Sequence, residues 1–344
     1  MSARAGGASS VAAAQPLPAA TPLLFALAGS EGLGAAVAAA LGTALAPHEE
    51  REFERGEHKS RPLASVRRRD VTVIHQVHGD LAGTTANDRL VRLWLFLAAL
   101  RDGGAGALTV VVPYLPYSRK DRRTKSNDPV STRYVAQLFE AVGAGCLVCV
   151  EPHNLAAFEN AFRIPTLPLP LAPLVADWLA ARVPPGPLTI VSPDIGGVKR
   201  AQQLAAVLAA RGRGQVGLAF MEKRRSAGVV GGETLVGETA STCLLVDDLA
   251  SSGGTLARAA ARCRERGATY VVGAVAHALL TPDAPAALAA ASFDTLLATD
   301  SVPVPAALRP ACGLETLPLA PYLAAALRCL WRGESLAELT GIDA

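Results

Sequence analysis

The sequence has little net charge and no long apolar run, and both absences exclude classes of protein. Its 344 residues carry 33 Lys and Arg against 30 Asp and Glu, so the composition does not indicate a nucleic-acid-binding protein. No stretch of about 20 residues is apolar without polar breaks, so we expect no membrane span and no membrane partner. Residues 1–20 lack the basic start and compact apolar core of a secretory signal. We therefore expect a disordered leader over 1–20 and a location in the cytoplasm.

Zinc-site and common nucleotide-binding motifs are also missing. Of six cysteines, only Cys146 and Cys149 form a C-x-x-C, and no second pair completes a zinc site. Both lie in an apolar run, where strand residues three apart point to opposite faces, so we interpret them as buried small hydrophobic residues. No Lys follows the glycines of residues 253–254 as in a Walker A motif, and the spacing G-x-G-x-x-G is absent there.

What the sequence does contain is an alternation of apolar strand candidates with Ala-rich helix candidates, which is typical of parallel sheets built from βαβ units. A length of 344 residues predicts two domains of ordinary size. Residues 167–187 are rich in Pro and Leu and suit a connection. We therefore predict an N-terminal domain over 21–166 and a C-terminal domain over 167–344.

Residues 244–256 carry the most specific chemistry. A buried strand ends in Asp247 and Asp248, and a Ser-Ser-Gly-Gly-Thr turn then opens a helix. Glycines allow the backbone to approach an anion, and free N–H groups at a helix start can hold a phosphate. Two adjacent acids beside such a loop suit a ribose diol or a phosphate-bound Mg²⁺. The alternative is a plain strand–turn–helix corner with surface acids.

Three further stretches follow strand ends. In residues 113–131, five Lys and Arg residues follow a stretch of Tyr and Pro, which suits the binding of a nucleotide, although a basic run is usually a solvated loop. Ser131 is expected to cap the next helix. Glu151 and His153 put an acid and a possible metal ligand or base together, against a surface His. The Lys-Arg-Arg run 223–225 is expected on a mobile loop, as a phosphate clamp or a solvated turn.

Taken in order, these motifs resemble those of ribose-phosphate diphosphokinase, the PRPP synthetase family, from about residue 23 to 336. The segments that carry the resemblance are 53–57 (F-x-D-G-E in the family), 87–88, 113–131, 151–153 (D-L-H), 192–200 (S-P-D-x-G-G-x-K-R), Lys223 with Arg225 (K-x-R), 247–255 and 333–335.

The resemblance implies two duplicated type I phosphoribosyltransferase-like domains, each a mostly parallel sheet flanked by helices, in a dimer-based homo-oligomer, possibly a hexamer. It implies that ATP and ribose 5-phosphate give AMP and 5-phosphoribosyl 1-diphosphate, with Mg²⁺. The roles that it assigns are catalysis by Lys223 and Arg225; ATP binding by Arg55, Gly56, Glu57, Arg119, Lys120 and Asp121, the first three from a neighbouring subunit; ribose 5-phosphate binding by Asp247, Asp248, Ser251, Ser252, Gly253, Gly254 and Thr255; and metal binding by His153 and Asp194.

Several positions depart from the family pattern. Ser251 and Ser252 stand where the family has Asp and Thr, Glu151 replaces a shorter acid, Lys120 replaces Gln, and residues 276–282 replace T-H-G-x-F-S-G. A non-catalytic associated subunit, a transferase that consumes PRPP and a synthetase with another pentose phosphate or diphosphate donor are the alternatives. Retention of Lys223 and Arg225 favours the active synthetase.

Overall fold

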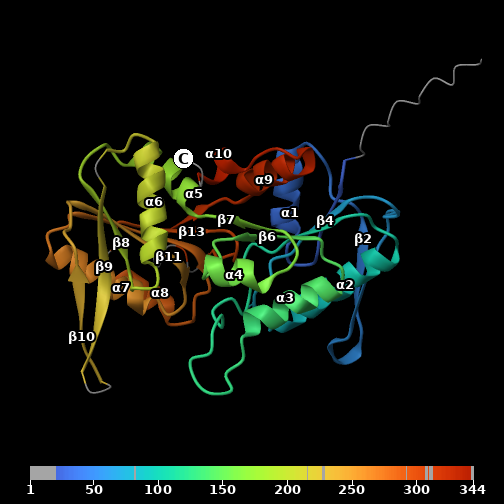
Figure 1. The fold of residues 1–344 in the computed structure, drawn as a ribbon, viewed down its shortest axis with the longest axis horizontal. Coiled ribbons are helices and arrows are strands. Elements are labelled where there is room, and N and C mark those ends of the chain that lie inside the picture. Colours follow the sequence, from blue (N-terminus) through green and yellow to red (C-terminus); the bar gives the residue numbers. More distant parts are fainter. Residues whose placement is uncertain are drawn as a thin grey trace, which may run out of the picture.

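The structure, a computed structural model, describes residues 21–341 apart from 81–82, 215, 227–228, 292, 307–308 and 310–312. Two sheets, each flanked by helices, are arranged side by side (Figure 1). The predicted α/β class with two mostly parallel sheets is confirmed. The predicted leader 1–20 lies outside the described residues.

The first sheet is entirely parallel, in the order β1-β4-β5-β6-β7. Its strands are β1 (Leu23–Ala26), β4 (Val71–Ile74), β5 (Leu108–Val111), β6 (Cys146–Val150) and β7 (Thr166–Leu169). Helices α2 (Ala86–Asp102), α3 (Ser131–Ala141) and α4 (Leu155–Ala161) contribute to the core on one face, where Phe25 meets Phe96 edge to face. A separate antiparallel hairpin joins β2 (His48–Glu52) to β3 (His58–Pro62) through the 3₁₀ turn η1 (Glu54–Gly56).

The second sheet has the order β10-β9-β8-β11-β12-β13-β14, and only the β9–β10 pair is antiparallel. Its strands are β8 (Leu188–Ser192), β9 (Val216–Ser226), β10 (Val229–Val236), β11 (Thr242–Ala250), β12 (Tyr270–Ala278), β13 (Thr295–Thr299) and β14 (Leu314–Leu317). Helices α5 (Ala172–Arg182) and α6 (Val198–Ala210) pack on one face, and α7 (Gly254–Glu265) and α8 (Ala284–Ala290) on the other.

The C-terminal helices return to the first sheet. Helix α9 (Ala320–Arg332) lies against α1 (Glu31–Leu41), and its Leu323 and Leu327 pack on first-sheet residues that include Ile74 (Figure 1). The short α10 (Ala337–Thr340) follows and contacts α5. The expected boundary between residues 166 and 167 falls inside β7, and the segment from α9 onward adds to the packing of the first domain. Both differences arise because tertiary contacts, and not local composition, decide which core a segment joins.

The segment around residues 223–225 differs from the expected loop. Strand β9 continues to Ser226, and its last residues pair with β10, with Lys223 opposite Glu233 and Arg225 opposite Val230. Met221 on β9 and Leu235 on β10 are buried and pair across the ladder, which anchors the hairpin to the sheet. The backbone of the Lys-Arg-Arg run is therefore strand, because long-range pairing provides partners for its N–H and C=O groups.

Specific residues cap the helix ends. Thr85 caps α2 in a reciprocal capping box with Asp88, and Gly42, with a φ of 70°, caps the C-terminus of α1. Ser131, expected to cap its helix, is instead the first residue of α3, and Val130 occupies the cap position.

Cys149 is fully buried, as expected, whereas Cys146 is partly exposed. Among the described residues, no helix has the length and apolarity needed to cross a bilayer.

Two buried histidines predict how stability depends on pH. His277 donates from Nε2 to the Val150 carbonyl at 3.1 Å and contacts Ser301 Oγ through Nδ1 at 2.8 Å, so it joins the two sheets. Burial lowers the pKa of His277 to about 4 and that of His75 to about 3. Below pH 6.5 the unfolded chain therefore binds more protons than the folded one, and each histidine costs about 2 kcal/mol at pH 5.

Urea unfolding at pH 7.5 and at pH 5.0 tests this. We expect a lower free energy of unfolding at pH 5.0, with a smaller loss in a His277→Gln variant because one titrating group is gone. An identical loss in the variant and the parent would contradict the assignment.

The glycine turn before α7 predicts a second effect on stability. Gly253 has a φ of 74°, and a Cβ there would lie 2.7 Å from Leu288 Cγ. Gly253→Ala is expected to lower the free energy of unfolding by about 2–4 kcal/mol, from left-handed strain and overpacking together. Gly254→Ala is the matched control, because its φ is not positive and its Cβ would lie 3.1 Å from the flexible end of Arg258 and 3.8 Å from Ser252 Oγ, an ordinary contact. Equal losses in thermal or urea unfolding would contradict this.

Candidate functional site

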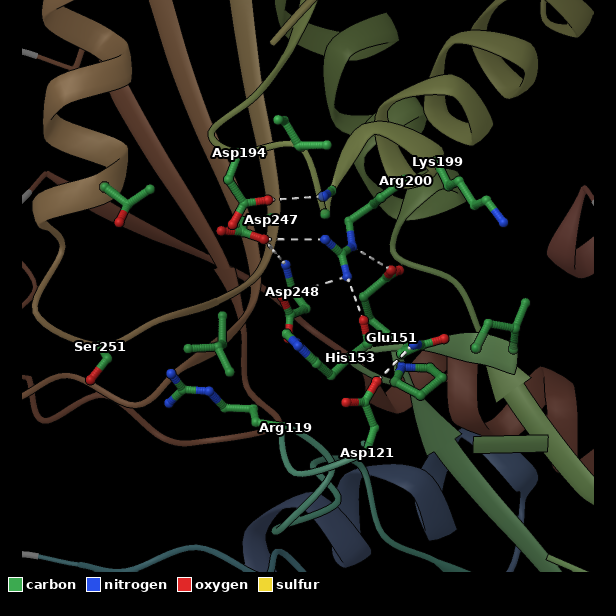
Figure 2. Close-up of a pocket in the computed structure, with 18 of the residues that line it drawn as sticks. Arg119, Asp121, Glu151, His153, Asp194, Lys199, Arg200, Asp247, Asp248 and Ser251 are labelled. Atoms are coloured by element: carbon green, nitrogen blue, oxygen red, sulfur yellow. Dashed lines mark hydrogen bonds and ion pairs between the residues drawn. The ribbon is translucent and has the colours of Figure 1, made fainter. Parts of the chain in front are cut away.

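A cavity of about 1100 Å³ opens between the two domains at the carboxyl ends of their strands. Loops after β5 and β6 form the first-domain wall, and loops after β8 and β11 form the second-domain wall. Ligands of open parallel sheets bind in such crevices, because helix N-termini and loop N–H groups converge there. Figure 2 shows charged side chains from both walls meeting across the cavity.

One guanidinium lies at the centre of the acidic groups. Arg200, in the first turns of α6, donates from Nε to Glu151 Oε1 at 2.7 Å and from Nη1 to Asp247 Oδ1 at 3.1 Å (Figure 2). Its Nη2 lies 3.5 Å from Asp248 Oδ1. The Arg200 side chain is only 11% exposed, so these are desolvated ion pairs with fixed geometry.

The two adjacent aspartates differ in their electrostatic environment. Burial raises the pKa of Asp247 well above the usual aspartate range, and the neighbouring Asp248 raises it further. Asp248 is also buried, but its hydrogen bond with His153 and the charge of Arg200 outweigh that burial and lower its pKa. Asp248 is therefore the carboxylate that remains ionised more readily, and Asp247 is the one whose charge a ligand would influence most.

His153 and Asp194, the predicted metal ligands, both line the cavity. His153 Nδ1 lies 2.7 Å from Asp248 Oδ2, and this hydrogen bond raises the pKa of the imidazole. A carboxylate that holds one imidazole nitrogen commonly orients the other toward a metal ion. Asp194 offers a carboxylate whose Oδ1 accepts from the Gly197 N–H at 3.0 Å.

Among the described residues, no group of three or more His, Cys, Asp or Glu side chains could hold a metal ion. Mg²⁺ keeps several waters and is often bound through one or two carboxylates plus substrate phosphates. The pair therefore fits a cation held mainly by phosphate and water, and does not fit a cage made only of protein.

The turn 251–255 lines the cavity beside Asp247 and Asp248. Gly253 adopts the left-handed conformation and Gly254 is the first residue of α7, so the N–H groups of the helix start are free to bind an anion. Ser251, Ser252, Gly253 and Thr255 face the cavity. The structure thus places the predicted acid pair and the predicted phosphate loop together.

The basic loop after β5 forms the opposite wall. Arg119 lines the cavity, and Figure 2 shows it extending toward the side where Ser251 lies. Lys120 also lines the cavity, but its Nζ lies 2.6 Å from Asp128 Oδ2. The hydrogen bond from Lys120, with others from Thr124 and Lys125, holds the pKa of Asp128 well below its usual range. Asp121 accepts from Asn154 at 2.7 Å, which joins this loop to α4.

Three of the residues predicted to bind ATP do not line this cavity. Arg55, Gly56 and Glu57 lie at the tip of the β2–β3 hairpin. Lys223 and Arg225 stand on β9, two and four residues beyond Met221, which does line the cavity.

Glu151 and Arg200 had no predicted role. The sequence offered only indirect signals, an acid after the strand at 146–150 and an Arg after the Gly-Gly turn at 196–197.

Known proteins of one family are similar to this chain over most of its length. Residues 23–143 match the model of the N-terminal domain of ribose phosphate pyrophosphokinase, and residues 174–290 match that of the phosphoribosyl transferase domain. A protein of Granulibacter bethesdensis named ribose-phosphate pyrophosphokinase is 35% identical over 309 residues, which are 89% of this chain and 96% of that protein. One of Hyphomonas neptunium with the same name is 35% identical over 278 residues, 80% of this chain and 85% of its own length.

A solved structure is also similar. The phosphoribosylpyrophosphate synthetase from Mycobacterium smegmatis superposes with a TM-score of 0.80 at 30% identity, covering 90% of this chain and 99% of that one. Sequence and fold agree over both domains, and the resemblance predicted from the motifs is confirmed. The chain belongs to the ribose-phosphate pyrophosphokinase, or PRPP synthetase, family.

Proposed function

We propose that this protein is an active ribose-phosphate diphosphokinase, which transfers the diphosphate group of ATP to the anomeric hydroxyl of ribose 5-phosphate. The observation that supports this most directly is the cavity between the domains, which both domains line. An acid pair and a helix-start phosphate loop line one wall, and a basic loop lines the other. Such a cavity suits two phosphorylated substrates that must meet in one orientation.

The second-domain wall is the proposed pentose site. Asp247 and Asp248 would accept hydrogen bonds from ribose hydroxyls. These bonds would stabilise the ionised form of Asp247 most, because burial opposes its charge. The 5-phosphate would lie at the turn formed by Ser251, Ser252, Gly253, Gly254 and Thr255, where the helix start favours negative charge.

The first-domain wall is the proposed ATP site. Arg119 and Lys120 would bind phosphate oxygens, and Asp121 would be held in place by Asn154. Arg55, Gly56 and Glu57 lie on the hairpin tip and do not line their own cavity, so their proposed contact with adenine requires a second copy of the chain. We therefore propose a homo-oligomer built from dimers, possibly a hexamer, that works in the cytoplasm.

Mg²⁺ is the proposed cation, with His153 and Asp194 as its protein contacts. When bound, it would neutralise phosphate charge and help to align the reacting oxygens. Asp248 would keep the His153 ring oriented through Nδ1.

In the proposed reaction, the anomeric oxygen of ribose 5-phosphate bonds to the β-phosphorus of ATP. The bond between that phosphorus and the oxygen bridging to the α-phosphate breaks, AMP leaves with that oxygen, and the hydroxyl proton is released. Lys223 and Arg225 would stabilise the charge that develops on the transferred group. Their place on a strand hairpin at the sheet edge suits an arm that approaches the cavity when substrates are bound.

One observation favours a second candidate, a non-catalytic associated subunit. Ser251 replaces the acid of the family loop, which removes one charged hydrogen-bond acceptor from the pentose site. Retained Lys223 and Arg225 favour the active enzyme.

Product analysis tests the proposal. Purified protein with Mg²⁺, ATP and ribose 5-phosphate should release AMP and form a pentose 1-diphosphate, both visible by ³¹P NMR, and EDTA should abolish the reaction. A protein that binds both substrates without releasing AMP, with or without inorganic phosphate, would instead favour the associated subunit.

A substitution of Lys223 on the β9–β10 hairpin tests the proposed catalytic role of that residue. Lys223→Ala should lower kcat by about 10²–10³-fold with little change in KM for ATP, because its contact would form mainly in the transition state. Lys59→Ala is the control, since Lys59 pairs with Glu49 on the β2–β3 hairpin and should leave kcat unchanged. Equal loss of kcat and ATP affinity in Lys223→Ala would argue against the role.

A further inference from the structure

Glu151 occupies an unusual position for a surface-loop acid beside a candidate metal ligand. It follows β6 with a φ of 39°, a backbone conformation that non-glycine residues rarely adopt, and is only 7% exposed. Both carboxylate oxygens already have protein partners. Oε1 accepts from Arg200 Nε at 2.7 Å, and Oε2 accepts from the Leu171 N–H at 2.6 Å. The carboxylate is thus engaged by two donors that follow it in the chain, at the start of α5 and in α6.

Arg200 links Glu151 to the acid pair Asp247 and Asp248. A guanidinium is planar and its donors have fixed directions, so fixing Nε on Glu151 also fixes where Nη1 and Nη2 point. Those atoms lie against Asp247 at 3.1 Å and Asp248 at 3.5 Å. Nη2 also donates to the His153 carbonyl at 3.4 Å, which adds a second contact with the first domain.

The domains contribute different parts of this network. Glu151 and His153 belong to the loop after the first-domain strand β6, whereas Arg200, Asp247 and Asp248 belong to the second domain. The acid pair is therefore oriented across the domain boundary. In the part of the chain that the structure describes, no hydrogen bond or ion pair joins the turn 251–255 or Arg119 to Glu151 or Arg200, so the phosphate loop and the basic wall are separate from the network.

We propose that Glu151 is a positioning residue of the pentose site, which through Arg200 sets the geometry of Asp247 and Asp248 and so couples pentose binding to the contact between the domains. This rests on the proposed function, because it assigns the acid pair to ribose hydroxyls. The Glu151 carboxylate contacts the Arg200 guanidinium and the Leu171 N–H at the same time.

Isothermal titration calorimetry with ribose 5-phosphate and, separately, with ATP tests the proposal without depending on turnover. Glu151→Gln keeps the size and the acceptor for the Leu171 N–H but loses the ion pair. We expect its Kd for ribose 5-phosphate to rise about tenfold while the Kd for ATP changes less than twofold. Arg200→Lys should likewise raise the Kd for ribose 5-phosphate and leave that for ATP nearly unchanged, because an ammonium group cannot reproduce the planar arrangement of guanidinium donors.

Arg211→Gln is the matched control, since Arg211 caps the C-terminus of the same helix and pairs with Asp177. It should leave both Kd values unchanged. Thermal unfolding of each variant checks the fold, and Arg200→Lys serves if Glu151→Gln fails to fold.

Three results would overturn the proposal. Unchanged ribose 5-phosphate binding in the folded variants would show that Glu151 does not position the acid pair. Equal weakening for ATP and ribose 5-phosphate would show a general structural role. A parent protein that releases AMP normally while both variants keep its KM for ribose 5-phosphate would contradict the positioning role and leave the proposed function standing.

Discussion

The contact of one guanidinium with three carboxylates is the constraint on which the site depends. Arg200 is almost fully buried and touches Glu151, Asp247 and Asp248. Without the Arg200 guanidinium, three carboxylates would lie close together in a desolvated space, and they could not all be ionised. Without the acids, a buried guanidinium would lack partners. Arg200 therefore stabilises the charged state of each carboxylate, the carboxylates stabilise the charge of Arg200, and the arrangement holds only while both domains contribute.

The fold supports this constraint in two ways. Parallel strands bring their carboxyl ends to one edge of each sheet, so the loops after β6, β8 and β11 meet around a common cavity. The chain also returns to the first domain at its end, where α9 packs on α1 and the first sheet. His277 adds a buried contact between the sheets through the Val150 carbonyl, one residue before Glu151. The domain junction is thus held near the residues that face the cavity.

The features of the site that depend on local residue types were predictable from the sequence. The glycine turn at 253–254, the acid pair before it and the strand-end His153 were recognisable because each needs particular residue types at fixed spacing. Contacts between distant segments were not predictable from local patterns. The return of α9 to α1 and the first sheet depends on tertiary neighbours. The pairing that extends β9 over Lys223 lies within one hairpin and the Lys120–Asp128 ion pair within one loop, but no residue pattern indicates either contact. Arg200 was visible only as part of a motif, since nothing local indicates that it meets acids 47 to 49 residues away.

A double-mutant cycle on Glu151 and Arg200 tests the central claim that this ionic contact positions the pentose site. The measurement is the free energy of ribose 5-phosphate binding in the parent, Glu151→Gln, Arg200→Gln and the double variant. We expect strong non-additivity, with the double variant binding no more weakly than the weaker single variant, because both substitutions break the same contact. Additive losses would contradict it, since they would show that the two residues act on binding independently.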